Sequence, residues 1–219
     1  MTELSIDERY HVVRRRVRLL TLLRAAADVG LDPLGVGTVH ALAYLTDALS
    51  PVWHLPPLDG QVLKRVVRPY FPALQRDVDA LVGAGLVEVV RFAHLPDEGG
   101  RGWRLDADLR LVGPAAAPVL AAVDGLPEQA SRAAFVREVV YAASGLGLNG
   151  VDRIGLLDAT YVDPRVDVGG VIDFAPEARM NPTAQAALGF AALASGVRLS
   201  EPELIHLYVR HLYAGLAGV

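Results

Sequence analysis

The sequence predicts a mostly α-helical protein with a small β wing. Apolar residues recur at helical spacing in several segments, whereas the alternating, β-branched pattern of strands is clearest within residues 86–112. Hydrophobic residues make up 52% of the 219 residues, so the chain can bury a substantial core. This length suits one large domain, or a domain of about 100 residues with a helical extension.

The first predicted element is a helix over residues 7–29. Val13 lies on its apolar stripe, and Gly30 suits the position that follows a helix C-terminus. After a short connector, a second helix is expected to run from a cap at Thr38 to about Leu49.

A loop and two further helices are predicted next. The prolines within residues 50–60 disfavour regular structure there. Residues 61–68 are predicted to form a short helix, which ends because the residue before Pro69 is disfavoured in helical conformation. Another helix is expected to start near Pro72, since proline is tolerated in a first turn. Its apolar face consists of Leu74, Val78, Leu81 and Val82.

A hairpin follows these helices. Residues 86–95 are rich in β-branched side chains, and residues 103–112 alternate between apolar and polar, so each segment is predicted to be a strand. Residues 96–102 have the composition of a turn. Three helices, a strand, a turn and a strand are the order of a winged-helix domain, which we place at residues 30–113, after an N-terminal helix in residues 1–29.

Residues 114–219 are predicted to form a helical C-terminal extension of the winged-helix domain. A helix is expected at about 128–145, followed by an irregular, aspartate-rich segment. Two more helices are predicted from their N-terminal caps. One begins after Asn181, and the other begins after Ser200, which has Glu203 three residues later.

The composition limits the chemistry that the chain can perform. It contains no cysteine, which excludes disulfides, thiolate metal sites and a cysteine nucleophile and is typical of a cytoplasmic protein. The first 30 residues carry arginines inside their apolar stretch, so no signal peptide is expected. The longest weakly polar run, residues 111–123, is too short to cross a bilayer, so no membrane contact is expected.

The helix before a wing is the element that most often enters the major groove of DNA. Here its exposed side offers Asp77 and Asp79 beside Gln75 and Arg76, and two carboxylates would repel phosphates. Solvent or another protein is therefore the favoured neighbour of this helix. The residues expected at such a partner interface are Gln75, Arg76 and Asp79.

Basic residues cluster elsewhere, on the first helix and in residues 61–68. They could contact the DNA backbone without reading its sequence, although a solvated charged face is the commoner meaning of such runs. The net charge of −4 shows that the chain as a whole is not built to hold a polyanion. The candidate contacts to the DNA backbone are Arg14, Arg15, Arg18, Lys64, Arg65 and Arg68.

No complete catalytic or metal-binding pattern is found. Four aspartates of the irregular segment suggest a cation site, but they lack the spacing of a calcium loop, and turn-forming roles are favoured. Glu203 and His206 have the spacing of a di-iron ligand pair, yet no second pair is present. We therefore predict a non-catalytic protein without a metal or cofactor. The four aspartates are Asp158, Asp163, Asp167 and Asp173.

The C-terminal helix spreads apolar residues over more than one stripe. Part of this surface is expected to meet another chain, with Tyr208, Arg210 and Tyr213 as anchors, because tyrosine and arginine are favoured at interfaces. The alternative, with equal weight, is that the other C-terminal helices cover this helix completely.

Three stretches resemble the middle component of bacterial three-component ABC systems. They are "YFPALQRDVDALVGAGLVEV" (70–89), "LLDATYVDP" to "GVIDF" (156–174) and "LYVRHL" (207–212). The resemblance implies a non-catalytic adaptor subunit, encoded between a coiled-coil SMC/Rad50-like ABC ATPase and an effector, in antiphage or plasmid defence. Its partners would be that ATPase and the effector subunit, with non-specific DNA as a further candidate. The alternative is a winged-helix, DNA-binding transcriptional regulator.

Overall fold

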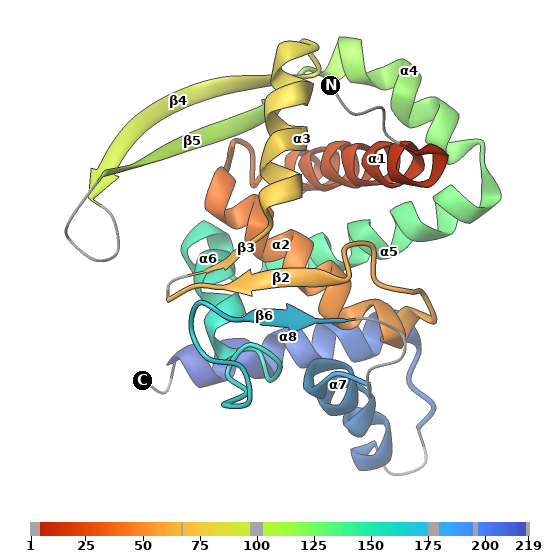
Figure 1. Cartoon of the computed structure of the whole chain (residues 1–219). Helices are drawn as coiled ribbons and strands as arrows, with labels where there is room; N and C mark the ends of the chain where they lie inside the picture. The colour runs from red at the N-terminus through yellow and green to blue at the C-terminus, as the bar shows by residue number, and fades with distance from the viewer. Residues whose placement is uncertain (1–4, 67, 97–102, 175–179, 195–196, 218–219) are drawn as a thin grey trace.

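Helices make up most of the computed structural model, which describes residues 5–66, 68–96, 103–174, 180–194 and 197–217 (Figure 1). The helices of these residues are α1 (Ile6–Asp28), α2 (Val36–Leu49), the 3-10 helix η1 (Ser50–Trp53), α3 (Pro72–Gly83), α4 (Gly113–Asp124), α5 (Pro127–Ser144), α6 (Gly147–Leu157), α7 (Pro182–Leu193) and α8 (Glu201–Ala217). The strands are β1 (Leu34–Gly35), β2 (Gln61–Lys64), β3 (Pro69–Tyr70), β4 (Val87–Pro96), β5 (Trp103–Leu111) and β6 (Val171–Asp173).

Helix α2 lies at the centre of the fold. All its residues from Gly37 to Leu49 are buried, and it packs against α1, α5, α6 and α7. Its residues belong to one hydrophobic core that also includes side chains of α1, α3, β5, α5 and α8. The core therefore runs through all three regions distinguished by the sequence.

Two small antiparallel sheets flank the helices. In the first, the strand order is β1-β5-β4, and the β4–β5 hairpin projects from the body of the molecule (Figure 1). In the second, the order is β3-β2-β6, so a strand of the C-terminal region completes a sheet that begins in the middle of the chain. Val62 of β2 stands opposite Ile172 of β6 in this sheet.

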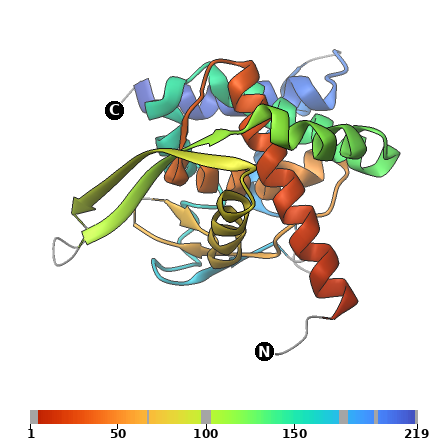
Figure 2. The same cartoon turned by 90° about the horizontal axis from the view of Figure 1, so that it is seen from above.

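Helix α1 has one buried half and one projecting half. Ser5 and Glu8 form a capping box at its start, and Gly30, with a φ of 75°, follows its end in the left-handed conformation that glycine tolerates. The buried residues lie between Arg18 and Ala26. The N-terminal half extends beyond the body of the protein (Figure 2).

Most of the predicted elements are confirmed. The structure is mostly helical with a small β-hairpin, and the helices predicted at residues 7–29, near Pro72, at 128–145 and after both N-terminal caps are present. Asn181 accepts a hydrogen bond from the backbone N–H of Ala184, as expected of a cap. The second helix also ends at Leu49 as predicted, although it begins at Val36 rather than at a Thr38 cap. Of the turn predicted at residues 96–102, Pro96 belongs to strand β4, and residues 97–102 lie outside the described residues.

The helix predicted at residues 61–68 is wrong, because Gln61–Lys64 form strand β2. Its partners, β3 and β6, supply backbone hydrogen-bonding groups from segments that the local sequence does not reveal. Three helices were not predicted. One is the short 3-10 helix η1, which lies within the loop predicted at residues 50–60, and the others are two α-helices. Helix α4 contains Pro118 within it, and α6 begins in a glycine-rich stretch, so local propensity disfavoured both.

Within the described residues, no helix combines the length and the apolar character that crossing a membrane requires.

Candidate functional site

The arginines of α1 face a set of buried carboxylates. Asp77 accepts hydrogen bonds from Arg15 Nε at 2.7 Å and from Arg16 Nε at 3.1 Å. Arg18 donates to Asp47 Oδ1 at 2.9 Å and also to Asp59. Each of the three carboxylates therefore pairs with at least one guanidinium. Together these ion pairs hold α1 against α2 and α3.

This pairing corrects two predictions. The Arg18 side chain is only 2% exposed, so it is not available to a DNA backbone, and Arg15 is largely enclosed by Asp77 and Asp59. Asp77 was assigned to the exposed side of the helix before the wing, but it is buried on the side that faces α1. Helical spacing alone does not reveal which face a neighbouring helix covers. The exposed acidic character of α3 is therefore reduced to Asp79.

The second group of basic residues, Lys64, Arg65 and Arg68, also contains both buried and exposed side chains. Lys64 is buried, and its Nζ donates to the backbone oxygens of Asp163 at 2.9 Å and Val166 at 2.7 Å, so its predicted role as a DNA contact is wrong. Arg65 is exposed and lies over the ring of Tyr70, with 3.9 Å from Cζ to the ring centroid. Arg65, Arg68 and Arg14 are at least partly exposed, and for them a DNA contact stays a prediction.

One of the predicted interface residues of α3, Gln75, contacts a buried histidine, His40. Arg76 and Asp79 are exposed, and Gln75 donates to Asp79 Oδ1 at 3.2 Å. The Oε1 atom of Gln75 lies 3.4 Å from His40 Nε2, and His40 Nδ1 accepts a hydrogen bond from the backbone N–H of Phe71 at 3.2 Å. This arrangement requires a neutral imidazole with its proton on Nε2. Burial lowers the pKa of His40 to about 4, and the charges of Arg65 and Arg18 add to the shift.

Acidification is therefore expected to destabilise the protein through His40. Between pH 6.5 and about 4 the unfolded chain protonates this imidazole while the folded protein leaves it neutral, so stability falls as the pH falls. A pKa lowered by this amount corresponds to about 3 kcal/mol. Urea unfolding of the wild type and of His40→Asn, near neutral pH and near pH 4, separates this contribution from that of the carboxylates. An equal pH dependence in both proteins would contradict the prediction.

The three predicted anchors of α8 lie in different environments. Tyr208 is 1% exposed, donates to Asp158 Oδ1 at 2.8 Å and accepts from the backbone N–H of Ala159 at 3.1 Å. It is a core residue, so the prediction of a partner contact is wrong for Tyr208. Helices α5, α6 and α7 pack against α8, but they do not cover it completely as the alternative interpretation expected, because Leu207 and Tyr213 are exposed. Arg210 and Tyr213 are exposed and remain candidates.

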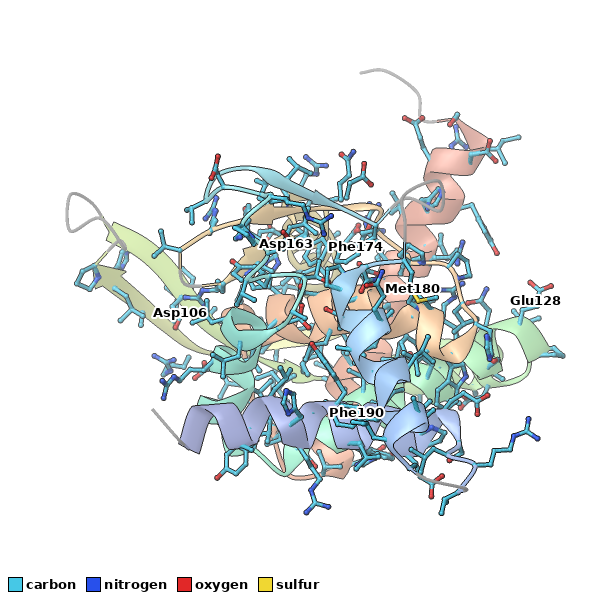
Figure 3. The ribbon with its side chains drawn as sticks, turned by 90° about the horizontal axis from the view of Figure 1, so that it is seen from below. Asp106, Glu128, Asp163, Phe174, Met180 and Phe190 are labelled. Atoms are coloured by element: carbon cyan, nitrogen blue, oxygen red, sulfur yellow. The ribbon has the colours of Figure 1, made fainter. Side chains whose placement is uncertain are left out.

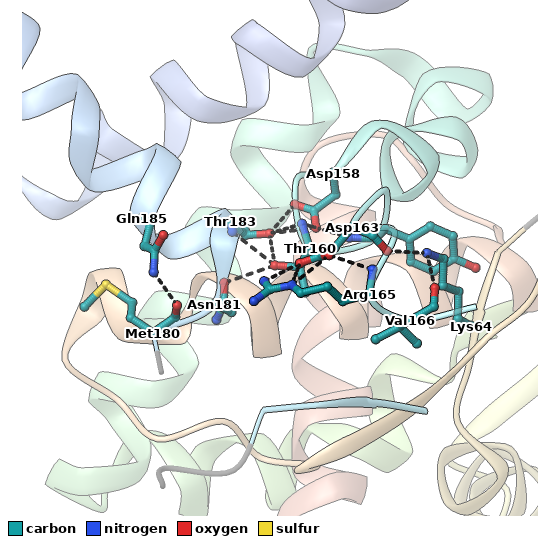
Figure 4. A network of polar contacts seen from close by, with 11 residues as sticks. Lys64, Asp158, Thr160, Asp163, Arg165, Val166, Met180, Asn181, Thr183 and Gln185 are labelled. Atoms are coloured by element: carbon teal, nitrogen blue, oxygen red, sulfur yellow. Dashed lines mark hydrogen bonds and ion pairs between the residues drawn. The ribbon is translucent and has the colours of Figure 1, made fainter. Parts of the chain in front are cut away.

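A buried carboxylate organises the segment between α6 and α7 (Figure 4). Asp158 is completely buried and accepts hydrogen bonds from the hydroxyls of Tyr44, Tyr208 and Thr183. It also accepts from the backbone N–H groups of Thr160, at 3.0 Å, and Tyr161, at 3.2 Å. Burial raises the pKa of Asp158, and the hydrogen bonds oppose that shift. The network joins α2, α7 and α8 and so has a structural role.

The other aspartates of this segment lie apart from Asp158. Asp163 pairs with Arg165, whose hydrogen bonds lower the Asp163 pKa to about 2, and Asp173 accepts a 3.5 Å hydrogen bond from Gln61. Asp167 is exposed. In the described part of the chain, no group of three or more histidine, aspartate or glutamate side chains could hold a metal ion.

Glu203 and His206, which have the spacing of a ligand pair but were not predicted to bind metal, have partners within the protein. Glu203 accepts hydrogen bonds from the backbone N–H and the hydroxyl of Ser200, which is the predicted N-terminal cap. His206 Nε2 lies 2.6 Å from Glu138 Oε1 on α5. Both residues therefore fix the position of α8.

A pocket of about 550 Å³, lined by both polar and apolar side chains, lies beside the Asp158 network. Figure 3 labels two of its lining residues, Asp163 and Met180, which come from the loop after α6 and the segment before α7. Polar side chains of the lining are bonded within the protein. Asn181 caps α7 and donates to the backbone oxygen of Ala48, and Gln185 donates to the backbone oxygen of Met180. The hydrogen-bonding groups of these two side chains are therefore used to stabilise the walls of the pocket.

An apolar groove of about 510 Å³ separates α1 from α4. Tyr10, Val13 and Leu126, which line it, are each more than half exposed. Isolated apolar residues on a surface are ordinary, but several in one concave groove are typical of an interaction site. The other apolar residues of the lining are Val17, Pro118, Val119, Ala122 and Val123.

The α1 wall of this groove has the spacing of a coiled-coil seam. Ile6, Tyr10, Val13, Val17 and Leu20 are separated alternately by four and three residues. Leu20 is buried in the core, whereas Ile6 is exposed on the projecting half of the helix. The stripe therefore starts as core packing and continues onto the surface, where a further helix could pack against it.

The groove was not predicted from the sequence because α4 was not predicted. The signal that could have found α4 is Pro114, which lies at one of the first two helical positions, where proline is favoured. The α1 stripe was recognised, but its exposed half could not be distinguished from its buried half without the neighbouring helices.

Comparisons of the chain with protein-family models, characterised proteins and solved structures find no match. The function is therefore inferred from the surfaces of the described residues.

Proposed function

We propose that this chain is a non-catalytic winged-helix adaptor, which docks onto a helix of a partner protein through the groove between α1 and α4. The single observation that carries the proposal is the exposed apolar stripe of α1, which continues the core spacing along a groove. A helix laid into an apolar groove is a common mode of recognition. The sequence resemblance supports a coiled-coil SMC/Rad50-like ABC ATPase as the partner, with an effector as a further subunit.

The strand order supports the winged-helix part of the proposal. Helices α1, α2 and α3 precede the β4–β5 hairpin, and the short strand β1 pairs with β5 to give the order β1-β5-β4. In this interpretation α1 belongs to the domain as its first helix, and the β2–β3 segment is an insertion before α3. Because one fold can host many functions, this likeness supports only the winged-helix architecture. The proposed function depends on the groove.

The DNA-binding alternative receives less support from the side chains. Two of the six candidate contacts, Arg18 and Lys64, are buried, and Arg15 is held by carboxylates. Loss of three contacts would reduce the electrostatic attraction to a polyanion substantially.

Charge placed in the groove is expected to weaken docking. Val13→Glu introduces a carboxylate that a packed apolar helix would have to desolvate, so the affinity for the ATPase should fall by at least about tenfold. Val168→Glu is the matched control, because Val168 is 59% exposed and Val13 is 56% exposed, and Val168 lies outside the groove.

The affinities are measured by calorimetry with the coiled-coil ABC ATPase encoded by the neighbouring gene. Circular dichroism of both variants establishes that each is folded. Equal affinities of Val13→Glu and Val168→Glu for the ATPase, or no binding by the wild type, would overturn the proposed docking function.

A further inference from the structure

The apolar groove leads into a basic recess at its inner end. The groove and the recess share Arg14, Val17 and Gln129 as lining residues. The recess adds Arg18 and Arg132 and has a volume of about 10 Å³, which is the size of a single acceptor atom or one water molecule. Thr21, Ala133 and Val136 complete its walls.

The positive charge of this recess is not balanced by the neighbouring carboxylates. Asp47, Asp59 and Asp77 already pair with Arg15, Arg16 and Arg18. Among the described residues, Arg14 has a contact with the Tyr10 ring and no ion pair, and Arg132 donates to the backbone oxygen of Pro56. These two guanidiniums therefore leave the inner end of the groove positive.

Two arginines that line the recess, Arg14 and Arg18, each carry a buried donor without an acceptor. The Nε atoms of Arg14 and Arg18 are both buried, and neither has a hydrogen-bond partner in the described protein. A buried donor without a partner costs about 1–3 kcal/mol, more if it is charged. Burial lowers the pKa of Arg132, and the charges of Arg14 and Arg18 lower it further. A bound anion would accept hydrogen bonds from the unpaired Nε–H groups and would reduce the repulsion between the arginines.

We propose that the recess receives a carboxylate side chain, so that the groove selects a partner helix that carries an aspartate or glutamate within its apolar face. This inference rests on the proposed docking function and names the chemistry of the docked segment. The partner helix lies in the apolar groove, and the two unpaired Nε–H groups donate hydrogen bonds to the carboxylate of its acidic residue. A polyanion such as nucleic acid fits less well, because the recess admits one acceptor atom and its surroundings are apolar.

A matched pair of small probes tests the inference on the full chain. 2-Naphthoate and 2-naphthamide have the same apolar ring and differ in charge, and their binding is followed by NMR titration of the arginine Nε–Hε signals. Charge-assisted hydrogen bonds are about twice as strong as neutral ones. We expect 2-naphthoate to bind about tenfold more tightly than 2-naphthamide and to shift the Nε signals of Arg14 and Arg18.

Single arginine variants locate the effect. Arg14→Gln and Arg132→Gln should each weaken 2-naphthoate binding by about tenfold while leaving 2-naphthamide unchanged. Arg210→Gln on α8 is the control, because Arg210 is exposed and lies outside the groove. The same substitutions should weaken binding of the ATPase in the same order.

The outcomes separate the inference from the proposed function. Equal affinities of the wild type for the two probes would overturn the acidic-residue inference and leave the docking groove intact. If neither probe binds, the proposal that the groove is a docking site would be overturned. If the wild type is a dimer in solution and Val13→Glu makes it a monomer, the occupant of the groove is a second copy of the chain. That result would overturn the proposal that a helix of a partner protein binds there.

Discussion

Replacing Asp158 by alanine is expected to lower the free energy of unfolding by about 3–5 kcal/mol. The carboxylate is completely buried and accepts hydrogen bonds from the hydroxyls of Tyr44, Tyr208 and Thr183. Two backbone N–H groups, those of Thr160 and Tyr161, also donate to it. Its removal leaves several buried donors without an acceptor, and each costs about 1–3 kcal/mol before the structure relaxes. Urea unfolding at neutral pH measures the effect.

Asp158→Asn distinguishes an ionised carboxylate from a protonated one. Backbone N–H groups and hydroxyls donate to both carboxylate oxygens of Asp158. An amide NH₂ replaces one of these acceptors by a donor and forces the hydroxyls around it to reorient, so a loss of about 2 kcal/mol is expected. Asp167→Asn, at an exposed position in the following loop, should change stability by less than about 0.5 kcal/mol. Full stability of Asp158→Asn would show that the buried group carries a proton.

Replacing Arg18 by methionine is expected to destabilise the protein by about 3–5 kcal/mol. Arg18 is buried between Asp47 and Asp59, so its loss leaves carboxylates without their counter-charge. Burial raises the pKa of Asp47 to about 6 even with Arg18 in place, and Asp47 Oδ2 has no hydrogen-bond partner. Without Arg18, protonation of Asp47 should extend to higher pH, so the variant should recover part of its stability as the pH falls.

Arg16→Met is the control for this experiment. Arg16 pairs with a different carboxylate, that of Asp77, and its own side chain is 43% exposed. Because Asp77 keeps Arg15 as a counter-charge, the loss of Arg16 should cost only about 0–1 kcal/mol. The double variant Arg18→Met with Asp47→Leu removes both buried charges and should be more stable than Arg18→Met alone. A cost for Arg18→Met as small as that for Arg16→Met would contradict the buried ion pair.

Local signals were sufficient for the elements with strong caps and clear periodicity. Asn181 and Ser200 begin helices where they were predicted to, and the apolar spacing of Leu74, Val78 and Leu81 marks α3. The predicted helix at residues 61–68 failed for a non-local reason, because β2 obtains its hydrogen bonds from β6, more than one hundred residues away. Local propensity is a weak guide where such a partner exists.

The side chains of the site were harder to predict than the elements that carry them. The sequence shows that Tyr208 and Arg210 lie on different faces of one helix. Only the packed structure shows that Tyr208 is buried and donates a hydrogen bond to Asp158, whereas Arg210 is exposed. In the same way, Arg14 and Arg18 share a helix face, yet Arg18 meets buried aspartates and Arg14 borders a groove. These outcomes depend on tertiary neighbours that periodicity does not encode.

The central position of α2 has a consequence for how the protein is made on the ribosome. This helix is among the first to leave the exit tunnel, but two helices that cover it are synthesised much later, α6 about 100 residues and α7 about 130 residues after it. The sheet that contains β2 likewise remains incomplete until β6 is synthesised. At about 5–20 residues per second, the apolar surface of α2 stays uncovered for several seconds during translation. A nascent chain of this protein therefore depends on prompt completion, or on a chaperone that shields α2, to avoid aggregation.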